Sequence, residues 1–257
     1  MKKILFLVVA TILAEQVSAR YDFYAVCSSG QTLYYEYYGS NSVRIVYPGQ
    51  QGNEYDGYIK PTGNLIIPNV VSYGGNYSVV GIGDLAFHNC DGLTSITIPN
   101  SISQPIGNNA FGGCSNLKSV TINCDKDYIK ERARLSFIKN SIRYEVINTG
   151  ELQVVPLGYD GWGNTSPKYS GDIVIPAKVT IGKTFSVTQI HWDAFKKCQD
   201  LKSVAIPNSV TYIGSEAFRG CYNCTIYCQT TTKPSRWFPD WNPSECEVKW
   251  GAAYKFK

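Results

Sequence analysis

The chain has 257 residues, enough to bury a sizeable core in one or two domains. Charged residues make up 17% and aromatic residues 13%, with 19 tyrosines, a composition typical of a strand-rich protein. A formal net charge of +4, scattered along the chain, is too weak to indicate a nucleic-acid partner.

Residues 1–19 have the order of features of a secretory signal peptide. Lys2 and Lys3 precede the apolar run 4–14, which is too short to span a bilayer. We expect cleavage before Arg20 and a mature chain that is secreted, displayed on the cell surface or held in the periplasm. The alternative is a buried N-terminal strand. No other apolar run has the length of a transmembrane segment.

A β-hairpin is predicted next, because residues 34–38 and 43–46 read as two alternating strands around the turn 39–41. Tyrosines crowd the first of these strands, and half of them face outward if it is a strand. Exposed tyrosine rings suit contacts with protein or glycan ligands, so Tyr35 and Tyr37 are candidate binding residues. The alternative is a cap whose rings merely cover an open end of the fold.

One sequence pattern then occurs four times, at 82–98, 106–122, 190–207 and 213–221. Most copies begin with Ile-Gly, all contain Ala-Phe-x-x-Cys, and the complete ones continue with leucine and alternating aliphatic residues. The first two copies are 24 residues apart, and a period of about 20–29 is typical of leucine-rich repeats. We therefore expect a leucine-rich-repeat solenoid of α/β type, β-rich, with a strand at 93–98 and a short helical turn at 86–90.

Residues between the core positions of each strand are expected to point outward and to form a strand face. Thr97, Thr121 and Ala205 line this face, and Lys118 and Lys202 lie beside the strand starts. We predict that the strand face is the main binding surface.

Residues 125–141 join the two halves and read as a short amphipathic connector helix, because Ile129, Ala133 and Phe137 recur every four residues. Several lysines and arginines lie among them. One interpretation is a role at a membrane surface or with a polyanion. We favour the other, a connector with a solvated basic face.

The chain also contains a larger duplication. Ile67-Pro68 matches Ile175-Pro176, and Ala86-Phe87 matches Ala194-Phe195, each pair being 108 residues apart. We therefore predict two hairpin-plus-repeat modules and a C-terminal cap, at 20–124, 142–228 and 229–257.

The third copy of the repeat has His191-Trp192 in place of the usual glycine and its neighbour. This irregular pair is either a binding site or a tolerated substitution, and the second interpretation is favoured. His88 is the other histidine, and neither has a partner at triad-like or metal-like spacing. We predict no catalytic, cofactor-binding or metal-binding residue, and no enzymatic activity.

Equivalent side chains should stack from repeat to repeat in a common core. Phe87 is expected against Phe111, and Phe195 against Phe218. Cysteine recurs at one position of the repeat, at Cys90, Cys114, Cys198 and Cys221. We favour a ladder of reduced, buried thiols over disulfides at this position.

The other cysteines allow different pairings. The dense cluster that ends at Cys228 resembles half of a zinc site whose second half is missing. A disulfide from Cys246 to Cys224 or Cys228 would fasten the tail to the last repeat, and we prefer this interpretation. The pairing of Cys27 and Cys124 is left open.

The pattern Ile-Gly-x-x-Ala-Phe-x-x-Cys-x-x-Leu-x-Ser-[Ile/Val]-x-Ile-Pro, in residues 82–123 and 190–228, resembles the BspA-like leucine-rich-repeat family of bacterial surface proteins. The resemblance implies export and adhesion to host proteins or to other cells. The expected partner is a protein or glycan ligand outside the cell. The alternative is a glycan-capture or structural component of an envelope assembly. The sequence indicates no cofactor and leaves the oligomeric state open.

Overall fold

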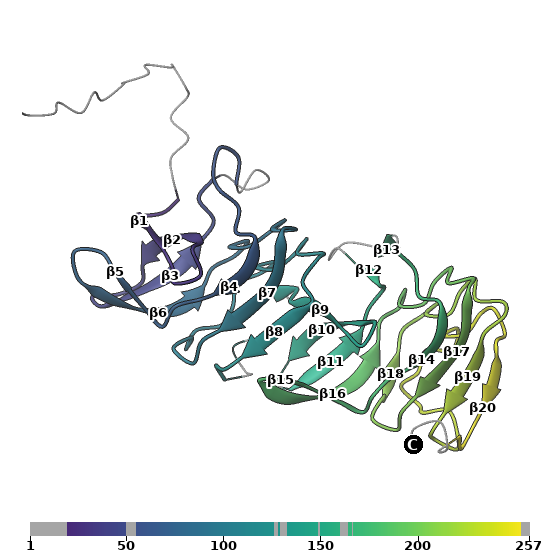
Figure 1. Ribbon diagram of the computed structural model, residues 1–257. Coiled ribbons are helices and arrows are strands. Elements are labelled where there is room, and N and C mark those ends of the chain that lie inside the picture. The colour runs from purple at the N-terminus through teal and green to yellow at the C-terminus, as the bar shows by residue number, and fades with distance from the viewer. Residues whose placement is uncertain are drawn as a thin grey trace, which may run out of the picture.

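The computed structural model describes residues 20–49, 55–125, 128, 133–148, 150–159, 164–165 and 167–252. The described chain is an elongated stack of strands, with β1 (Phe23–Val26) near one end and β20 (Glu247–Lys249) at the other (Figure 1). Nearly all of its regular structure is strand, which confirms the β-rich class. Within this part of the chain, no helix is long and apolar enough to cross a membrane. The predicted signal peptide lies outside the described residues.

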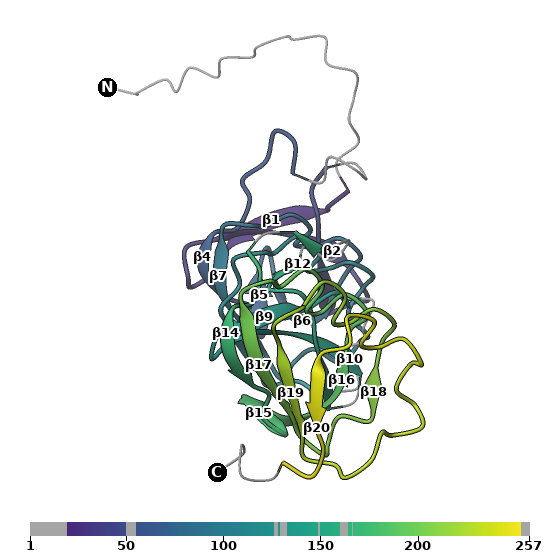
Figure 2. The ribbon, with the colours of Figure 1, turned by 90° about the vertical axis from the view of Figure 1, so that its right-hand side faces the viewer.

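Two parallel ladders contain the predicted repeat strands, in the orders β4-β7-β8 and β14-β17-β19-β20. Their bounds are β4 (Gly63–Ile66), β7 (Leu93–Ile98), β8 (Ser119–Ile122), β14 (Gly171–Val174), β17 (Leu201–Ile206) and β19 (Thr225–Cys228). Figure 2 looks along the stack from the C-terminal end, where the strands of the second ladder follow one another. The aliphatic residues of the pattern, such as Ile96, Ile98 and Val204, are buried as predicted.

Two larger sheets carry the hairpins, and they share one topology. The first has the order β1-β2-β3-β6-β5 and the second β9-β10-β11-β16-β15, with the short β18 (Tyr212–Ile213) paired to β16. The bounds in the first are β2 (Thr32–Tyr37), β3 (Ser42–Val46), β5 (Val70–Ser72) and β6 (Asn76–Ile82). Those in the second are β9 (Ser136–Lys139), β10 (Ile142–Asn148), β11 (Glu151–Val154), β15 (Lys178–Ile181) and β16 (Lys183–Ile190). Both predicted hairpins are present, as β2-β3 and β10-β11, and the two sheets repeat one strand order. A small pair, β12 (Gly158–Tyr159) and β13 (Asn164–Thr165), stands apart.

The connector helix predicted over 125–141 is wrong over residues 136–139. Its last part is strand β9, antiparallel to β10, and the Ile138 amide donates to the Leu117 carbonyl over 3.1 Å. Phe137 is completely buried. The segment forms a strand instead of the helix that the four-residue spacing predicted, because β9 makes hydrogen bonds both to the end of the first module and to β10. Residues 126, 127 and 129–132 lie outside the described residues.

The predicted helical turns are also wrong. Residues 84–89 form tight turns in which Leu85 and Asn89 adopt left-handed backbone angles, with φ of 57° and 56°. The Phe87 amide donates to the Ala110 carbonyl of the next repeat over 2.8 Å. The His88 and Cys90 amides donate to the carbonyls three residues back, so the segment alternates local turns with bonds between repeats and is not an α-helix.

The stacked phenylalanines are confirmed. The ring centroids of Phe87 and Phe111 lie 5.4 Å apart, and those of Phe195 and Phe218 lie 4.9 Å apart, both pairs nearly parallel. All four rings are buried in one core cluster. The stack ends on Trp241, whose ring meets Phe218 edge-on at 5.6 Å.

All nine cysteines are described, buried and present as free thiols. The repeat cysteines point into the core as predicted, and Cys114 donates its thiol proton to the Phe87 carbonyl over 3.2 Å. Burial raises the pKa of Cys124 to about 11 and that of Cys228 to about 12, so both stay protonated at neutral pH. The predicted disulfide from Cys246 is not formed; Cys246 instead donates to the Cys221 carbonyl over 2.8 Å and contacts the Cys224 thiol.

Candidate functional site

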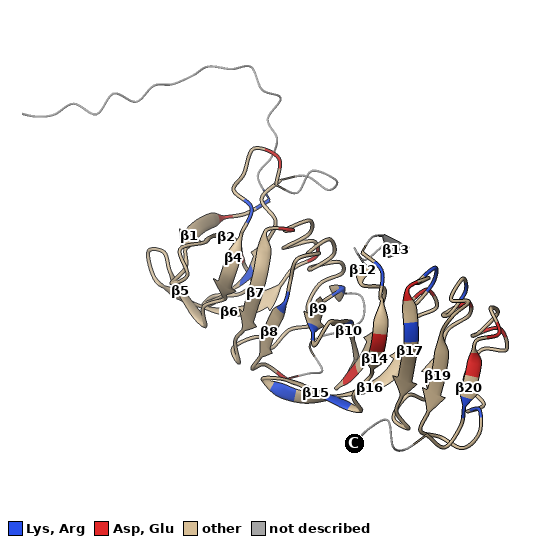
Figure 3. Cartoon of the chain, turned by 45° about the vertical axis from the view of Figure 1, so that its right-hand side comes forward, with Lys and Arg blue, Asp and Glu red and all other residues tan. Residues whose placement is uncertain are grey.

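The strand face is built from the outward side chains of the two ladders. Thr97 and Thr121 are half-buried and lie side by side in register. Lys118 and Lys202 are exposed beside the strand starts, as predicted. β4, β7 and β8 contain no charged residue, whereas the second ladder has Asp172 on β14, Lys202 on β17, and Glu247 and Lys249 on β20 (Figure 3).

Ala205 is a wrong choice for a contact residue. It is only 2% exposed, although it lies at the same outward position as Thr97. Its register partners are Val174 on β14 and Tyr227 on β19. We attribute its burial to these larger neighbours, which stand on both sides of its single methyl group.

Short hydrogen bonds tie the polar side chains of the strand face to one another. The Ser95 hydroxyl donates to Asn64 Oδ1 over 2.5 Å, and Ser203 makes the same bond to Asp172 Oδ1 over 2.5 Å. The same side-chain pair thus recurs at the equivalent place of both ladders. Exposed Ile66 and Val174 add apolar surface beside it.

Tyr35 is likewise a wrong choice. It faces the same side of β2 as Tyr37, but its ring is fully buried and stacks on Phe23 at 5.3 Å. Tyr37 ends the strand and is 46% exposed, with its ring 5.2 Å from that of Tyr77. Tyr73 stacks on Phe23 at 4.4 Å. The position along the strand therefore decides exposure, because β1 pairs with residues 32–35 of β2 and not with Tyr37.

His191 and Trp192 lie at the turn after β16. Trp192 is 51% exposed, its ring is 5.1 Å from that of His191, and the Lys196 ammonium lies 5.7 Å above it. A side chain at Gly214 would meet the Trp192 backbone at 2.5 Å, so the next repeat needs glycine there. His191 is half-buried and accepts a hydrogen bond from the Asp193 amide at Nδ1 over 3.3 Å.

The imidazole of His191 predicts a pH dependence of stability. Burial, with a smaller contribution from the positive charge of Arg134, lowers the pKa of His191 to about 4. An unfolded chain has a histidine pKa of about 6.5 and binds the proton earlier as the pH falls. Between about pH 7 and about pH 4.5, wild type should lose on the order of 2 kcal/mol more stability than His191→Gln. Urea unfolding of both proteins across this range measures the difference, and parallel curves would contradict it.

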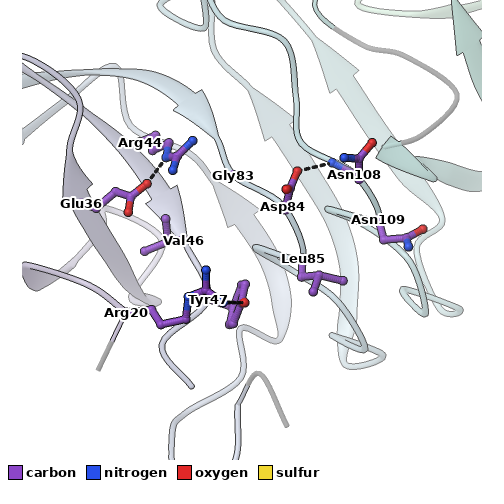
Figure 4. A pocket seen from close by; sticks show the side chains of 10 residues that line it. All are labelled: Arg20, Glu36, Arg44, Val46, Tyr47, Gly83, Asp84, Leu85, Asn108 and Asn109. Carbon is purple, nitrogen blue, oxygen red and sulfur yellow. Dashed lines mark hydrogen bonds and ion pairs between the residues drawn. The ribbon is translucent and has the colours of Figure 1, made fainter. Parts of the chain in front are cut away.

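A polar pocket lies beside the first hairpin, and the sequence did not indicate it. Its volume is about 330 Å³, and Figure 4 shows its lining residues: Arg20, Glu36, Arg44, Val46, Tyr47, Gly83, Asp84, Leu85, Asn108 and Asn109. They come from the segment before β1, from β2, from β3 and the residue after it, and from the turns of the first two repeats. The cross-strand places of Glu36 and Arg44 are the one sequence feature that could have indicated this site.

The charged groups of the pocket are arranged in pairs. Arg44 donates to Glu36, its register partner across the hairpin, and Arg20 donates to the Tyr47 hydroxyl. Asp84 Oδ1 accepts a hydrogen bond from the Asn108 amide over 2.6 Å. Guanidinium, carboxylate and amide groups thus surround one hollow, and among the described residues no group of three or more His, Cys, Asp or Glu could hold a metal ion.

Comparisons with known proteins found solved structures of leucine-rich-repeat proteins at low sequence identity. A leucine-rich-repeat protein from Bacteroides ovatus is 20% identical over 90% of this chain and 72% of its own, with a TM-score of 0.35. A leucine-rich cell surface protein from Faecalibacterium prausnitzii is 19% identical over 84% of this chain and 77% of its own, with a TM-score of 0.29. A search among curated proteins found no match.

The family model for the BspA type leucine-rich repeat region matches six copies. These copies fall in residues 69–150 and 177–235, which together are more than half of the chain. The stacked phenylalanines and the four repeat cysteines lie within these segments, and the repeat strands β7, β8, β17 and β19 do as well. The chain therefore belongs to the BspA-type leucine-rich-repeat family.

Proposed function

We propose that this protein is a non-enzymatic binding protein that acts outside the cytoplasm and contacts a partner macromolecule through its strand face. Membership of a repeat family, the predicted signal peptide and the likeness to a cell surface protein support the location. The observation that carries the proposal is the uncharged ladder β4-β7-β8, with its row of Ile66, Thr97 and Thr121.

The row of Ile66, Thr97 and Thr121 has the composition expected of a contact surface for a partner protein. Charged residues are depleted at the centres of protein interfaces, and small side chains let a partner approach closely. Ile66 is exposed at the edge of the row and offers an apolar anchor, while the threonine hydroxyls can donate and accept hydrogen bonds. Because the strands already pair with one another, recognition here uses side chains rather than an added strand.

The double substitution Thr97→Arg and Thr121→Arg tests the proposal. Two long charged side chains at the centre of the face should weaken partner binding at least about tenfold. The wild-type chain is first applied to an array of extracellular-matrix proteins, and the affinity of both chains for each bound protein is then measured by surface plasmon resonance. Thr180→Arg is the matched control. Thr180 is an exposed threonine on β15, in the sheet of the second hairpin, and this variant should bind normally.

Equal affinities of wild type and the double variant would rule out the strand face as the contact surface. A wild-type chain that retains none of the arrayed proteins would count against a matrix partner. The same variant also separates the strand face from the pocket, which lies on other elements of the fold.

A further inference from the structure

The pocket beside the first hairpin continues into a second hollow. This smaller hollow, of about 130 Å³, shares Arg44, Gly83 and Asp84 with the first and adds Tyr38 and Gln104 among its lining residues. Two adjoining hollows with a common wall form a short groove. Its larger part lies at the lower end of the size range of small-molecule sites.

The duplication provides an internal comparison for this groove. Glu36 and Arg44 face each other across the first hairpin, and Glu145 and Gln153 occupy the matching places across the second. Glu145 is completely buried and accepts a hydrogen bond from Gln153 over 2.6 Å. In the first module the side chains of Arg44 and Glu36 are 43% and 28% exposed. The cross-strand pair is therefore buried and carries one charge fewer in the second module, whereas in the first module both of its side chains are accessible.

The residue at the start of the repeat separates the two versions. Gly83 lies 108 positions before His191, and Asp84 lies 108 positions before Trp192. A Cβ atom at Gly83 would lie 3.4 Å from Val46 Cγ1 and 3.9 Å from Arg44 Nε, both lining residues of the pocket. Any side chain at this position would thus enter the hollow, and His191 has such a side chain in the second module.

The chemistry of the groove identifies the ligand class. Two guanidinium groups and two carboxylates balance one another, so neither an anion nor a cation is favoured as a whole. Donors and acceptors lie close together, and a hydroxyl group can both donate and accept. The exposed ring of Tyr38, with the Arg44 guanidinium carbon 5.6 Å from its centroid, offers an amphipathic surface at the second hollow.

We propose that this groove binds a neutral saccharide, with one sugar ring among Glu36, Arg44 and Asp84 and the next ring near Tyr38. The site is separate from the strand face and does not depend on the function proposed for that face. It would give the protein a glycan contact in addition to a macromolecular partner.

Isothermal titration calorimetry of the purified chain tests the proposal with maltose, cellobiose, lactose and diacetylchitobiose as probes. At least one of them should bind saturably at roughly millimolar concentration. Gly83→His and Arg44→Gln should each lower its affinity at least about tenfold. Both variants place in the first module a residue that the second module already has, so they should fold, which circular dichroism checks.

A strand-face variant and two charged probes distinguish a neutral-saccharide site from a zwitterion site or an anion site. Thr97→Arg on the strand face should leave disaccharide binding unchanged. Binding of glycylglycine or of sialyllactose without binding of any neutral disaccharide would overturn the assignment, since it would identify a zwitterion or anion site. Full affinity in the folded Gly83→His variant, or the failure of all four disaccharides, would overturn it as well.

Discussion

Replacing Phe195 with alanine is expected to lower the free energy of unfolding by about 3–5 kcal/mol. The ring is fully buried and lies 4.9 Å from Phe218 and 5.0 Å from Tyr169, measured between centroids. Its removal takes apolar area from the core and leaves a cavity between neighbouring repeats. Backbone hydrogen bonds between the repeats fix their spacing, so the cavity cannot close completely. Urea unfolding followed by circular dichroism measures the loss.

Phe238→Ala is the matched control for this substitution. The Phe238 ring is 43% exposed and meets Tyr212 edge-on at 5.9 Å, so its truncation should cost less than about 1 kcal/mol. Losses of equal size in the two variants would show that the phenylalanine stack is not the core that joins the repeats.

The repeat pattern predicted the parts of the fold whose position depends on periodicity. Ile96 and Ile98 had to be buried because two residues separate neighbours on one face of a strand. Phe87 and Phe111 had to stack because stacked repeats bring equivalent residues together. The two hairpins followed from alternating apolar residues on both sides of a turn. Each of these predictions needed only the order of apolar residues along the chain.

The wrong predictions concern hydrogen bonds between segments that are distant in sequence. Residues 86–90 have the spacing of a helical turn, yet the Phe87 amide bonds to the next repeat. Phe137 fits the spacing of a helix, yet it lies in β9 because β10 needs an antiparallel partner. Local spacing cannot reveal such pairing, since the partner strand is identified only once the chain has folded.

The candidate site shows the same division. Alternation placed Tyr35 and Tyr37 correctly on one face of β2, but it could not show that Tyr35 is fully buried while Tyr37, whose ring also lies near Phe23, stays 46% exposed. The pocket escaped prediction because its residues come from a hairpin and from two successive turns. The irregular His191-Trp192 pair was visible in the sequence. Its counterpart in the first module is Gly83-Asp84, and the lack of a side chain at Gly83 leaves room for the pocket.

A buried arginine joins the two modules, and its loss is the second large effect that we expect. Arg143 on β10 donates to the carbonyls of Ser115, at the end of the first module, and of Leu157. It also donates to the Ser136 hydroxyl over 3.3 Å. Burial lowers the pKa of Arg143, so its charge is maintained by these acceptors rather than by water.

Arg143→Met should therefore destabilise the protein by about 3 kcal/mol, because it fills the space but leaves two part-buried carbonyls and a buried hydroxyl without this donor. Arg143→Lys should recover only part of the loss, since one ammonium group cannot replace a planar guanidinium that reaches three acceptors. Arg219→Met is the control: this arginine is exposed and pairs with Glu216 at 2.7 Å, so its loss should cost below about 1 kcal/mol. Urea unfolding compares the three variants with wild type. If Arg143→Met were as stable as Arg219→Met, the contacts to Ser115 and Leu157 would contribute little, and the modules would be joined by strand pairing and core packing alone.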